Sequence, residues 1–363
     1  MKKRIEYTDV KIGNAFPHWF EYDSPDGELR PGTWGVGEVS YEDGSVYRGT
    51  LLFRDGTLNK YGFGEQDFTS ACQTAADFGA DSDKYKPYKF VGEYDYIRGD
   101  WIFGNGVMYF TDMSGKPAAY ATGRFCGTWR FGDYEGEFFP ELLLPGFEGL
   151  PQIELTVRKA QFDAIYEVAK KAGECKSVLV GDSWFEFYSS REPSIVALCG
   201  LGDLYETDTA GKSVINLGIG GTTYIEWAPN IERILKQIKF DRLFFNLGFN
   251  DLHFVRTEDE TFADFVNVAE AALRARPDAK LFVNAVCPAP AKPRHTEVKA
   301  RLNKRIKDYC AAHENFTYLP SNEVFLDKNG RAIKDLADYF ATDGIHLNRK
   351  GYERWTAYMK KYF

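Results

Sequence analysis

The chain has 363 residues, 44% of them hydrophobic and 27% charged, which is the balance of a globular protein with room for one large domain or two ordinary ones. Its net charge of -8 argues against a nucleic-acid binder and against docking on anionic lipid, because both need clustered basic residues. No apolar run reaches the roughly 18 residues that a membrane-spanning helix needs.

The N-terminus and the cysteines predict a cytoplasmic location. The first residues, MKKRIEYTDVK, carry the charges of a signal peptide but have no apolar stretch behind them. The six cysteines lie far apart and form no CxxC pair, so neither a zinc site nor a disulfide framework is indicated. We therefore expect a reduced chain without an integral membrane segment.

Residues 1–150 differ in composition from the rest of the chain and predict a separate all-β domain. They hold 22 of the 34 glycines, together with many aromatic residues and little helical periodicity. Glycine supplies the positive φ that tight hairpin turns require, so this pattern favours short strands. The boundary is expected at 140–151, where prolines and glycines interrupt an apolar run.

A short motif recurs within this half. GxG occurs at 35–37, 62–64 and 104–106, and an aromatic residue stands two positions before a glycine at 47–49, 90–92, 125–127 and 134–136. This pattern resembles MORN repeats over roughly residues 30–140, with 69–89 as an inserted loop. Another glycine-rich β-meander remains the alternative, and the repeats offer a surface for protein contacts or oligomerisation.

Residues 151–363 alternate short apolar runs with amphipathic stretches, which predicts repeated βα units and a parallel sheet. A first helix is expected over 156–172, with Thr156 as its N-cap. The expected strands are 177–181, 213–217, 242–247, 280–286 and 316–320, and the further helices are 224–238, 259–275, 295–313 and 349–362.

Residues with catalytic chemistry follow several of these strands. GDSW at 181–184 places Ser183 at a strand-to-helix turn, NLGIGG at 216–221 exposes backbone N–H groups, GFND ends at 251, and DGIH spans 343–346. A serine nucleophile needs a base, an orienting group for that base, and N–H donors for the oxyanion. The carboxyl ends of parallel strands lie at one edge of the sheet, so these parts are expected to meet there.

The blocks GDS, NxGxxG, GxND and DxxH, in this order, resemble those of the SGNH (GDSL-type) hydrolases. The resemblance covers about residues 175–363 and implies a flavodoxin-like, three-layer α/β domain and ester hydrolysis through an acyl-serine. Carried over by position, Ser183 is the nucleophile, His346 the general base and Asp343 its orienting carboxylate. The backbone N–H groups of Ser183 and Gly221 and the side-chain amide of Asn250 would form the oxyanion hole.

Three further residues are candidates for the substrate pocket: Trp184, His253 and His295. Tryptophan stands at 184 where the family name has leucine. The bulky residues at 184, 185, 187 and 188 are expected to close an acyl pocket rather than leave a channel, while some of them must face the core. His253 follows the third block, and His295 ends the loop CPAPAKPRH after the fourth strand. Either histidine could also be taken for the base.

The leading hypothesis is a serine esterase for short acyl groups, mainly acetyl, on a sugar or other polar alcohol. It needs no metal and no cofactor, and its partner is a small-molecule or carbohydrate ester. One alternative is a lysophospholipase or thioesterase for longer chains. A second is an interaction module whose repeats dock a partner or lipid, with the hydrolase domain secondary.

Overall fold

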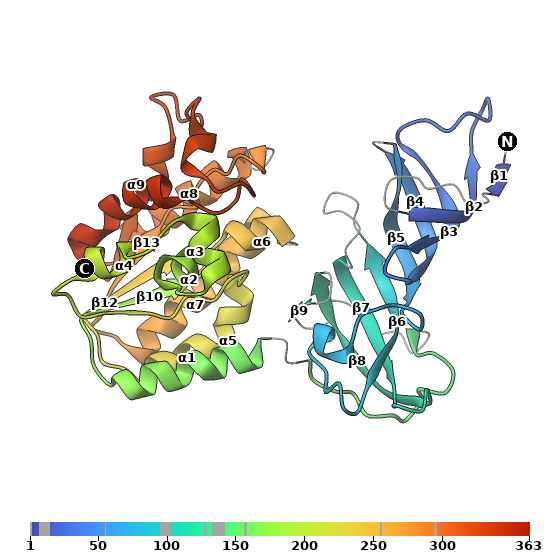
Figure 1. Cartoon of the computed structure of the whole chain (residues 1–363), viewed down its shortest axis with the longest axis horizontal. Coiled ribbons are helices and arrows are strands. Elements are labelled where there is room, and N and C mark those ends of the chain that lie inside the picture. Colours follow the sequence, from blue (N-terminus) through green and yellow to red (C-terminus); the bar gives the residue numbers. More distant parts are fainter. Residues whose placement is uncertain are drawn as a thin grey trace. The chain divides into compact units, whose positions relative to one another are not determined.

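The computed structural model describes residues 2–6, 15–54, 56–94, 103–126, 129–132, 142–155, 158–254, 256–293 and 296–363. The chain divides into two compact units, Met1–Ala160 and Gln161–Phe363. The first is built mainly of strands, and the second combines strands with helices (Figure 1).

The first unit contains an antiparallel sheet in which each strand pairs with the next along the chain. In the described residues it has nine strands: β1 (Lys2–Glu6), β2 (Ala15–Asp23), β3 (Thr33–Tyr41), β4 (Val46–Arg54), β5 (Thr57–Asp67), β6 (Lys86–Tyr94), β7 (Phe103–Thr111), β8 (Pro117–Cys126) and β9 (Trp129–Gly132). An all-β first half, as predicted, is therefore present.

The glycines and aromatics of the recurring motif pack against each other in this sheet. Gly49 on β4 pairs with Gly64 on β5. A Cβ on Gly64 would lie 2.3 Å from the hydroxyl oxygen of Tyr47, because the tyrosine ring covers this glycine. Gly106 is covered by the Phe90 ring in the same way, with 2.2 Å to Cζ. The motif thus lets an aromatic side chain lie flat on the neighbouring strand.

The inserted loop predicted at 69–89 ends earlier than expected. Residues 86–89 belong to β6, which pairs with both β5 and β7. The segment before it forms a short 3-10 helix, Ala75–Phe78, whose Phe78 is fully buried in the core of this unit. Polar residues surround Phe78 in the sequence, so its burial could not be predicted from a hydrophobic pattern. The motif at 134–136 lies outside the described residues.

The second unit contains a five-stranded parallel sheet in the order β11-β10-β12-β13-β14. Its strands are β10 (Ser177–Gly181), β11 (Val214–Asn216), β12 (Arg242–Asn246), β13 (Lys280–Asn284) and β14 (Phe316–Leu319). The expected five parallel strands are confirmed. Every residue of β10 is buried, which explains why such strands appear in the sequence as continuous apolar runs.

Helices lie on both sides of this sheet (Figure 1). They are α1 (Lys159–Ala172), α2 (Ser183–Ser189), α3 (Pro193–Cys199), α4 (Leu204–Thr209), α5 (Tyr224–Leu235), α6 (Phe249–Phe254), α7 (Glu258–Ala275), α8 (Thr296–Ala311) and α9 (Arg349–Met359). The first helix begins at Lys159, and the proposed N-cap Thr156 lies outside the described residues.

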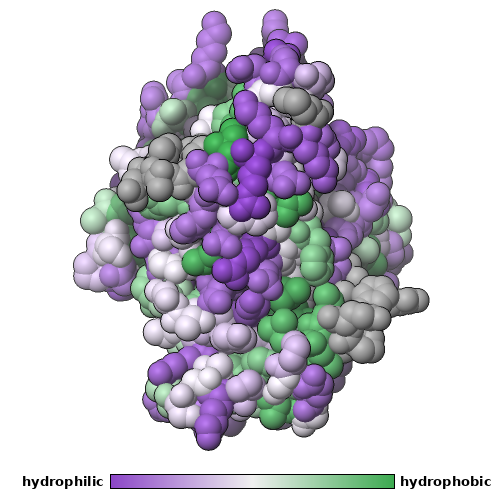
Figure 2. Space-filling model, turned by 90° about the vertical axis from the view of Figure 1, so that its right-hand side faces the viewer, coloured by the Kyte–Doolittle hydropathy of each residue, from purple (hydrophilic) through white to green (hydrophobic). Residues whose placement is uncertain are grey.

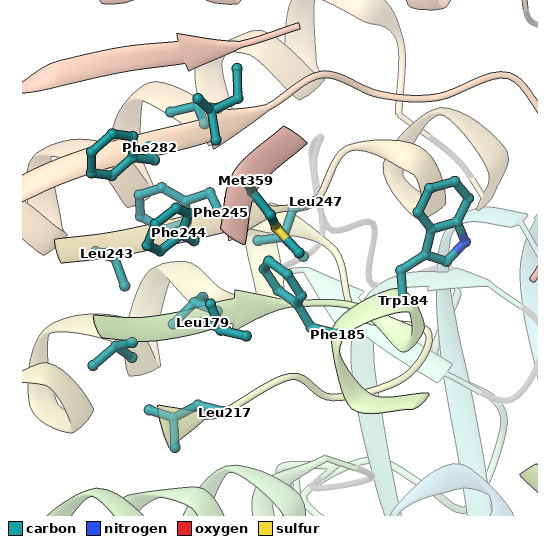
Figure 3. Close-up of a cluster of buried hydrophobic side chains, with 14 of the residues drawn as sticks. Leu179, Trp184, Phe185, Leu217, Leu243, Phe244, Phe245, Leu247, Phe282 and Met359 are labelled. Atoms are coloured by element: carbon teal, nitrogen blue, oxygen red, sulfur yellow. The ribbon is translucent and has the colours of Figure 1, made fainter. Parts of the chain in front are cut away.

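The sheet and α2 share one hydrophobic core. Phe185 of α2 points from its helix towards Met359 and Leu247, beside the phenylalanines of β12 (Figure 3). Phe185 and Met359 are fully buried. This packing fixes the helix that follows β10, and with it the turn that carries Ser183.

None of the described helices is long and apolar enough to cross a membrane. The face drawn in Figure 2 is mostly hydrophilic, and apolar residues form separate groups between the polar ones.

Candidate active site

Ser183 is the first residue of α2, directly after the turn that ends β10. The turn is tight, since a Cβ on Gly181 would lie 2.7 Å from the Phe185 ring of α2. Asp182 is the N-cap of α2, and its carboxylate accepts the Trp184 N–H at 3.0 Å. The N–H of a first helical residue has no acceptor within its own helix, so the Ser183 N–H can serve a ligand.

His346 and Asp343 lie beside this serine. The Nε2 atom of His346 is 2.9 Å from the Ser183 Oγ, and its Nδ1 is 2.5 Å from the Asp343 Oδ2. The other carboxylate oxygen of Asp343 accepts the backbone N–H groups of Ile345 and His346, each at 2.9 Å. A hydroxyl, an imidazole and a carboxylate thus form one hydrogen-bonded chain.

Electrostatics keep Asp343 ionised. Partial burial alone would raise the pKa of this carboxyl, but the His346 ring and two backbone N–H groups outweigh it, and the pKa lies below its usual value. An ionised Asp343 can hold one tautomer of His346 and stabilise the imidazolium that forms when His346 accepts a proton.

Two aromatic residues that the sequence did not assign to this role hold the histidine loop. The ring of Phe187 packs on the His346 ring, with 4.5 Å between centroids. The indole N–H of Trp184 donates to the carbonyl oxygen of Ile345 at 3.2 Å, and the hydroxyl of Tyr352 donates to the Trp184 carbonyl at 2.8 Å. These contacts connect α2 to the loop that carries His346.

The two other proposed oxyanion donors follow β11 and β12: Gly221 lies in the loop after β11, and Asn250 lies in α6. Gly221 has a φ of +72°, a conformation that favours glycine. Asn250 is 7% exposed, and its amide donates one N–H to the carbonyl oxygen of Thr222 at 3.0 Å. The amide group has a second N–H, which remains for a ligand.

Residues 179–354 match the model of the GDSL-like lipase/acylhydrolase family. The second unit carries a GDSL-like acylhydrolase domain. No curated protein matches the chain.

The domain is also similar to solved structures. One is described as a putative platelet activating factor from Streptococcus pneumonia, with 18% identity and a TM-score of 0.45, covering 56% of this chain and 93% of that one. A putative acylhydrolase from Bacteroides fragilis has 18% identity and a TM-score of 0.45, covering 58% and 97%. A family 3 carbohydrate esterase from Clostridium thermocellum has 23% identity and a TM-score of 0.38, covering 52% and 94%.

Trp184, a predicted pocket residue, is largely buried and lines only a small cavity of the GDSL-like domain. Residues 184–188 are helical, so Trp184, Phe185 and Tyr188 share the inward face of α2, with exposed fractions of 5%, 0% and 1%. Phe187 is the member of the predicted group whose ring contacts a residue of the candidate site, His346. Trp184, Phe185 and Tyr188 are therefore the members of the group that face the core, as some of them were expected to.

Of the two other histidines that the sequence made candidates, only His253 lies in the described part of the chain. His253 is half-buried in α6 and packs edge-on against Phe249, with 4.9 Å between ring centroids. His295 lies outside the described residues. Among those that are described, no group of three histidine, cysteine or acidic side chains could hold a metal ion.

Proposed function

We propose that the GDSL-like domain is a serine esterase that removes short acyl groups, above all acetyl, from a sugar or other polar alcohol. The single observation that carries this proposal is the hydrogen-bonded chain from the Ser183 Oγ through His346 to Asp343, within a domain of an acylhydrolase family. Such a chain turns a neutral hydroxyl into a nucleophile at moderate pH.

In the first half of the reaction, His346 accepts the Ser183 proton at Nε2 while Oγ attacks the ester carbonyl. The oxyanion that forms is held by the N–H groups of Ser183 and Gly221 and by the Asn250 amide. When this intermediate collapses, the bond to the alcohol oxygen breaks. His346 gives its proton to that oxygen, and the alcohol leaves behind an acyl-serine.

In the second half, a water molecule takes the place of the alcohol. His346 accepts its proton, the hydroxide attacks the acyl carbon, and the same donors hold the second oxyanion. Collapse breaks the bond to Ser183, whose Oγ regains a proton from His346, and the carboxylic acid leaves. Asp343 stays ionised throughout and stabilises the imidazolium in both halves.

A small cavity near the turn that carries Ser183 is in line with a short acyl group, although Ser183 itself does not line it. Its volume is about 10 Å³, roughly what one water-sized sphere occupies. Its walls come from residues adjacent in sequence to Ser183 and Asn250 and from the strand ends nearby, namely Asp182, Trp184, Asn246, Leu247, Phe249, Val286 and Cys287. A cavity of this size, walled by the buried rings of Trp184 and Phe249, has no room for an alkyl tail.

Acyl chain length provides the test. We expect kcat/KM to fall steeply from p-nitrophenyl acetate to butyrate and to octanoate. A methylene that fits a pocket changes binding by only about 1–3 kcal/mol, so a steep loss would indicate a steric wall. Equal or rising efficiency towards octanoate would contradict the short-acyl proposal and favour the lysophospholipase or thioesterase alternative.

We also propose that the first unit is a MORN-like hairpin array that serves as an interaction surface. The packing of Tyr47 and Phe90 on glycines of neighbouring strands supports the first part. Exposed apolar residues support the second, since Trp34 is 65% exposed and Phe63 51%. Replacing both by serine should abolish any self-association of the chain seen by sedimentation; association unchanged by this double variant would contradict the proposed surface.

A further inference from the structure

Glu186 lies between the nucleophile helix and the loop that supplies an oxyanion donor. It follows Ser183 by three positions in α2, so both side chains project from the same side of the helix. Its Oε2 accepts the backbone N–H of Gly220 at 2.8 Å. Gly220 directly precedes Gly221, whose own N–H is the proposed donor.

The loop and the helix are in close contact at this point. A Cβ on Gly220 would lie 2.4 Å from the Glu186 Oε2 and 3.6 Å from the Ser183 Cβ. A Cβ on Gly218 would lie 2.5 Å from the backbone nitrogen of Glu186. Glycines at both positions allow the loop to approach α2, and the same glycines leave its backbone with few steric restraints.

Hydrogen bonds hold the loop on either side of Gly220 and Gly221. The Ile219 N–H donates to the carbonyl oxygen of Gly181 at 2.9 Å, and the Thr222 hydroxyl donates to the Ile219 carbonyl at 2.7 Å. The Glu186 bond acts at Gly220 itself, next to the peptide that carries the donor. Loss of this bond would free that peptide to rotate about glycine dihedrals.

We propose that Glu186 is a positioning residue that orients the Gly221 N–H towards the oxyanion by holding the Gly220 N–H. The proposal rests on the proposed function of Ser183 and Gly221. An oxyanion donor is effective because it is oriented before the charge develops, so a rotating donor lowers kcat more than it changes KM. The role needs a hydrogen-bond acceptor at this position, and a glutamine oxygen can supply it.

The test compares Glu186→Ala with Glu186→Gln, using p-nitrophenyl acetate. We expect Glu186→Ala to lower kcat at least about tenfold with KM within about twofold, because the donor is mispositioned rather than removed. Glu186→Gln should restore kcat to within about threefold of the native value, because the acceptor is kept. The matched control is Glu167→Ala, which truncates an exposed glutamate on α1 and should leave both constants unchanged.

Gly220→Ala breaks the same bond from the loop side and serves if Glu186→Ala does not fold. Its Cβ would displace the flexible end of Glu186 and meet the Ser183 Cβ only at an ordinary contact distance. We expect a similar loss of kcat, and a double variant Gly220→Ala/Glu186→Ala no slower than either single one, because both changes remove one interaction.

Three outcomes would overturn the inference: an unchanged kcat in Glu186→Ala, a loss confined to KM, or a Glu186→Gln variant as slow as Glu186→Ala. Additive losses in the double variant would do the same. Failure of the proposed function looks different. In that case the native protein would show no turnover that depends on Ser183, whatever stands at 186.

Discussion

The side chain of Asn250 shows how one residue can serve both the structure and the proposed chemistry. One of its amide N–H groups donates to the Thr222 carbonyl, which connects the loops after β11 and β12. The other N–H is the proposed third oxyanion donor. Because the first bond fixes the amide plane, the second N–H is already oriented when substrate arrives.

Asn250→Ala is expected to lower kcat by roughly 10²–10³, the usual effect of removing one oxyanion donor, with KM little changed. Steady-state kinetics on p-nitrophenyl acetate measure both constants. Asn230→Ala on α5 is the matched control, since it also removes an amide bond to a backbone carbonyl, that of Glu226. A raised KM with normal kcat would instead make Asn250 a substrate-binding residue.

The sequence predicted the candidate catalytic residues that follow the ends of strands. Ser183, Asp343 and His346 could be placed together because parallel strands bring their carboxyl ends to one edge of a sheet. The packing of Phe187 on His346 and the bond from Glu186 to Gly220 could not be foreseen. Both depend on the rotation of α2 about its axis, which tertiary packing sets.

At the scale of an element, α2 begins at a buried carboxylate. Asp182 is 2% exposed, and the amide of Asn246 donates to the same oxygen that caps the helix, at 3.1 Å. Burial raises the pKa of Asp182 to about 7, although the hydrogen bonds from Trp184 and Asn246 oppose the rise. The folded protein therefore keeps a proton that the unfolded chain releases near pH 4.

This raised pKa predicts a pH-dependent stability. The contribution of Asp182 is present in full below about pH 4 and is lost as the pH rises through about 7, because only the unfolded chain ionises freely in that range. Between pH 5 and 8 the loss should be about 2–3 kcal/mol.

Urea unfolding of the native protein and of Asp182→Asn at several pH values measures this loss. The asparagine keeps a side-chain acceptor for the Trp184 N–H but cannot ionise, so its advantage over the native protein should grow with pH. Parallel profiles for the two proteins would contradict the protonated Asp182.

The strands and long helices of the second unit were predictable because their buried residues form recognisable apolar patterns in the sequence. Buried strands such as β12 are continuous apolar runs, and long helices such as α7 repeat their apolar positions every three to four residues. The short helices α3, α4 and α6, of six or seven residues, complete too few turns for a pattern and were missed. A helix at α2 was expected only through the strand-to-helix turn at Ser183, without an end.

At the scale of the whole molecule, each unit has a hydrophobic core of its own. The largest core cluster of the second unit is drawn from residues 162–363, and the clusters of the first unit come from residues 5–155. The proposed catalytic groups all belong to the second unit. These observations favour a hydrolase domain that functions without the first unit.

The division between the units lies about ten residues beyond the expected boundary at 140–151, since residues up to 155 still pack in the first core. A fragment that starts at Arg158, just before α1, should therefore keep the kcat of the full chain on p-nitrophenyl acetate to within a few-fold. Circular dichroism provides the control that the fragment is folded. A folded fragment without activity would show that the first unit completes the active site. If the fragment is insoluble, the full chain would be cleaved between the units by a protease, and kcat would be measured before and after cleavage.

The most direct test of the central claim is to identify the residue that an organophosphonate labels. Ser183 should carry a single adduct in peptide mass mapping, because the His346–Asp343 pair activates its hydroxyl and no other. Label and esterase activity should both disappear in Ser183→Ala while the protein remains folded. An adduct on another residue, or full esterase activity in Ser183→Ala, would contradict the account.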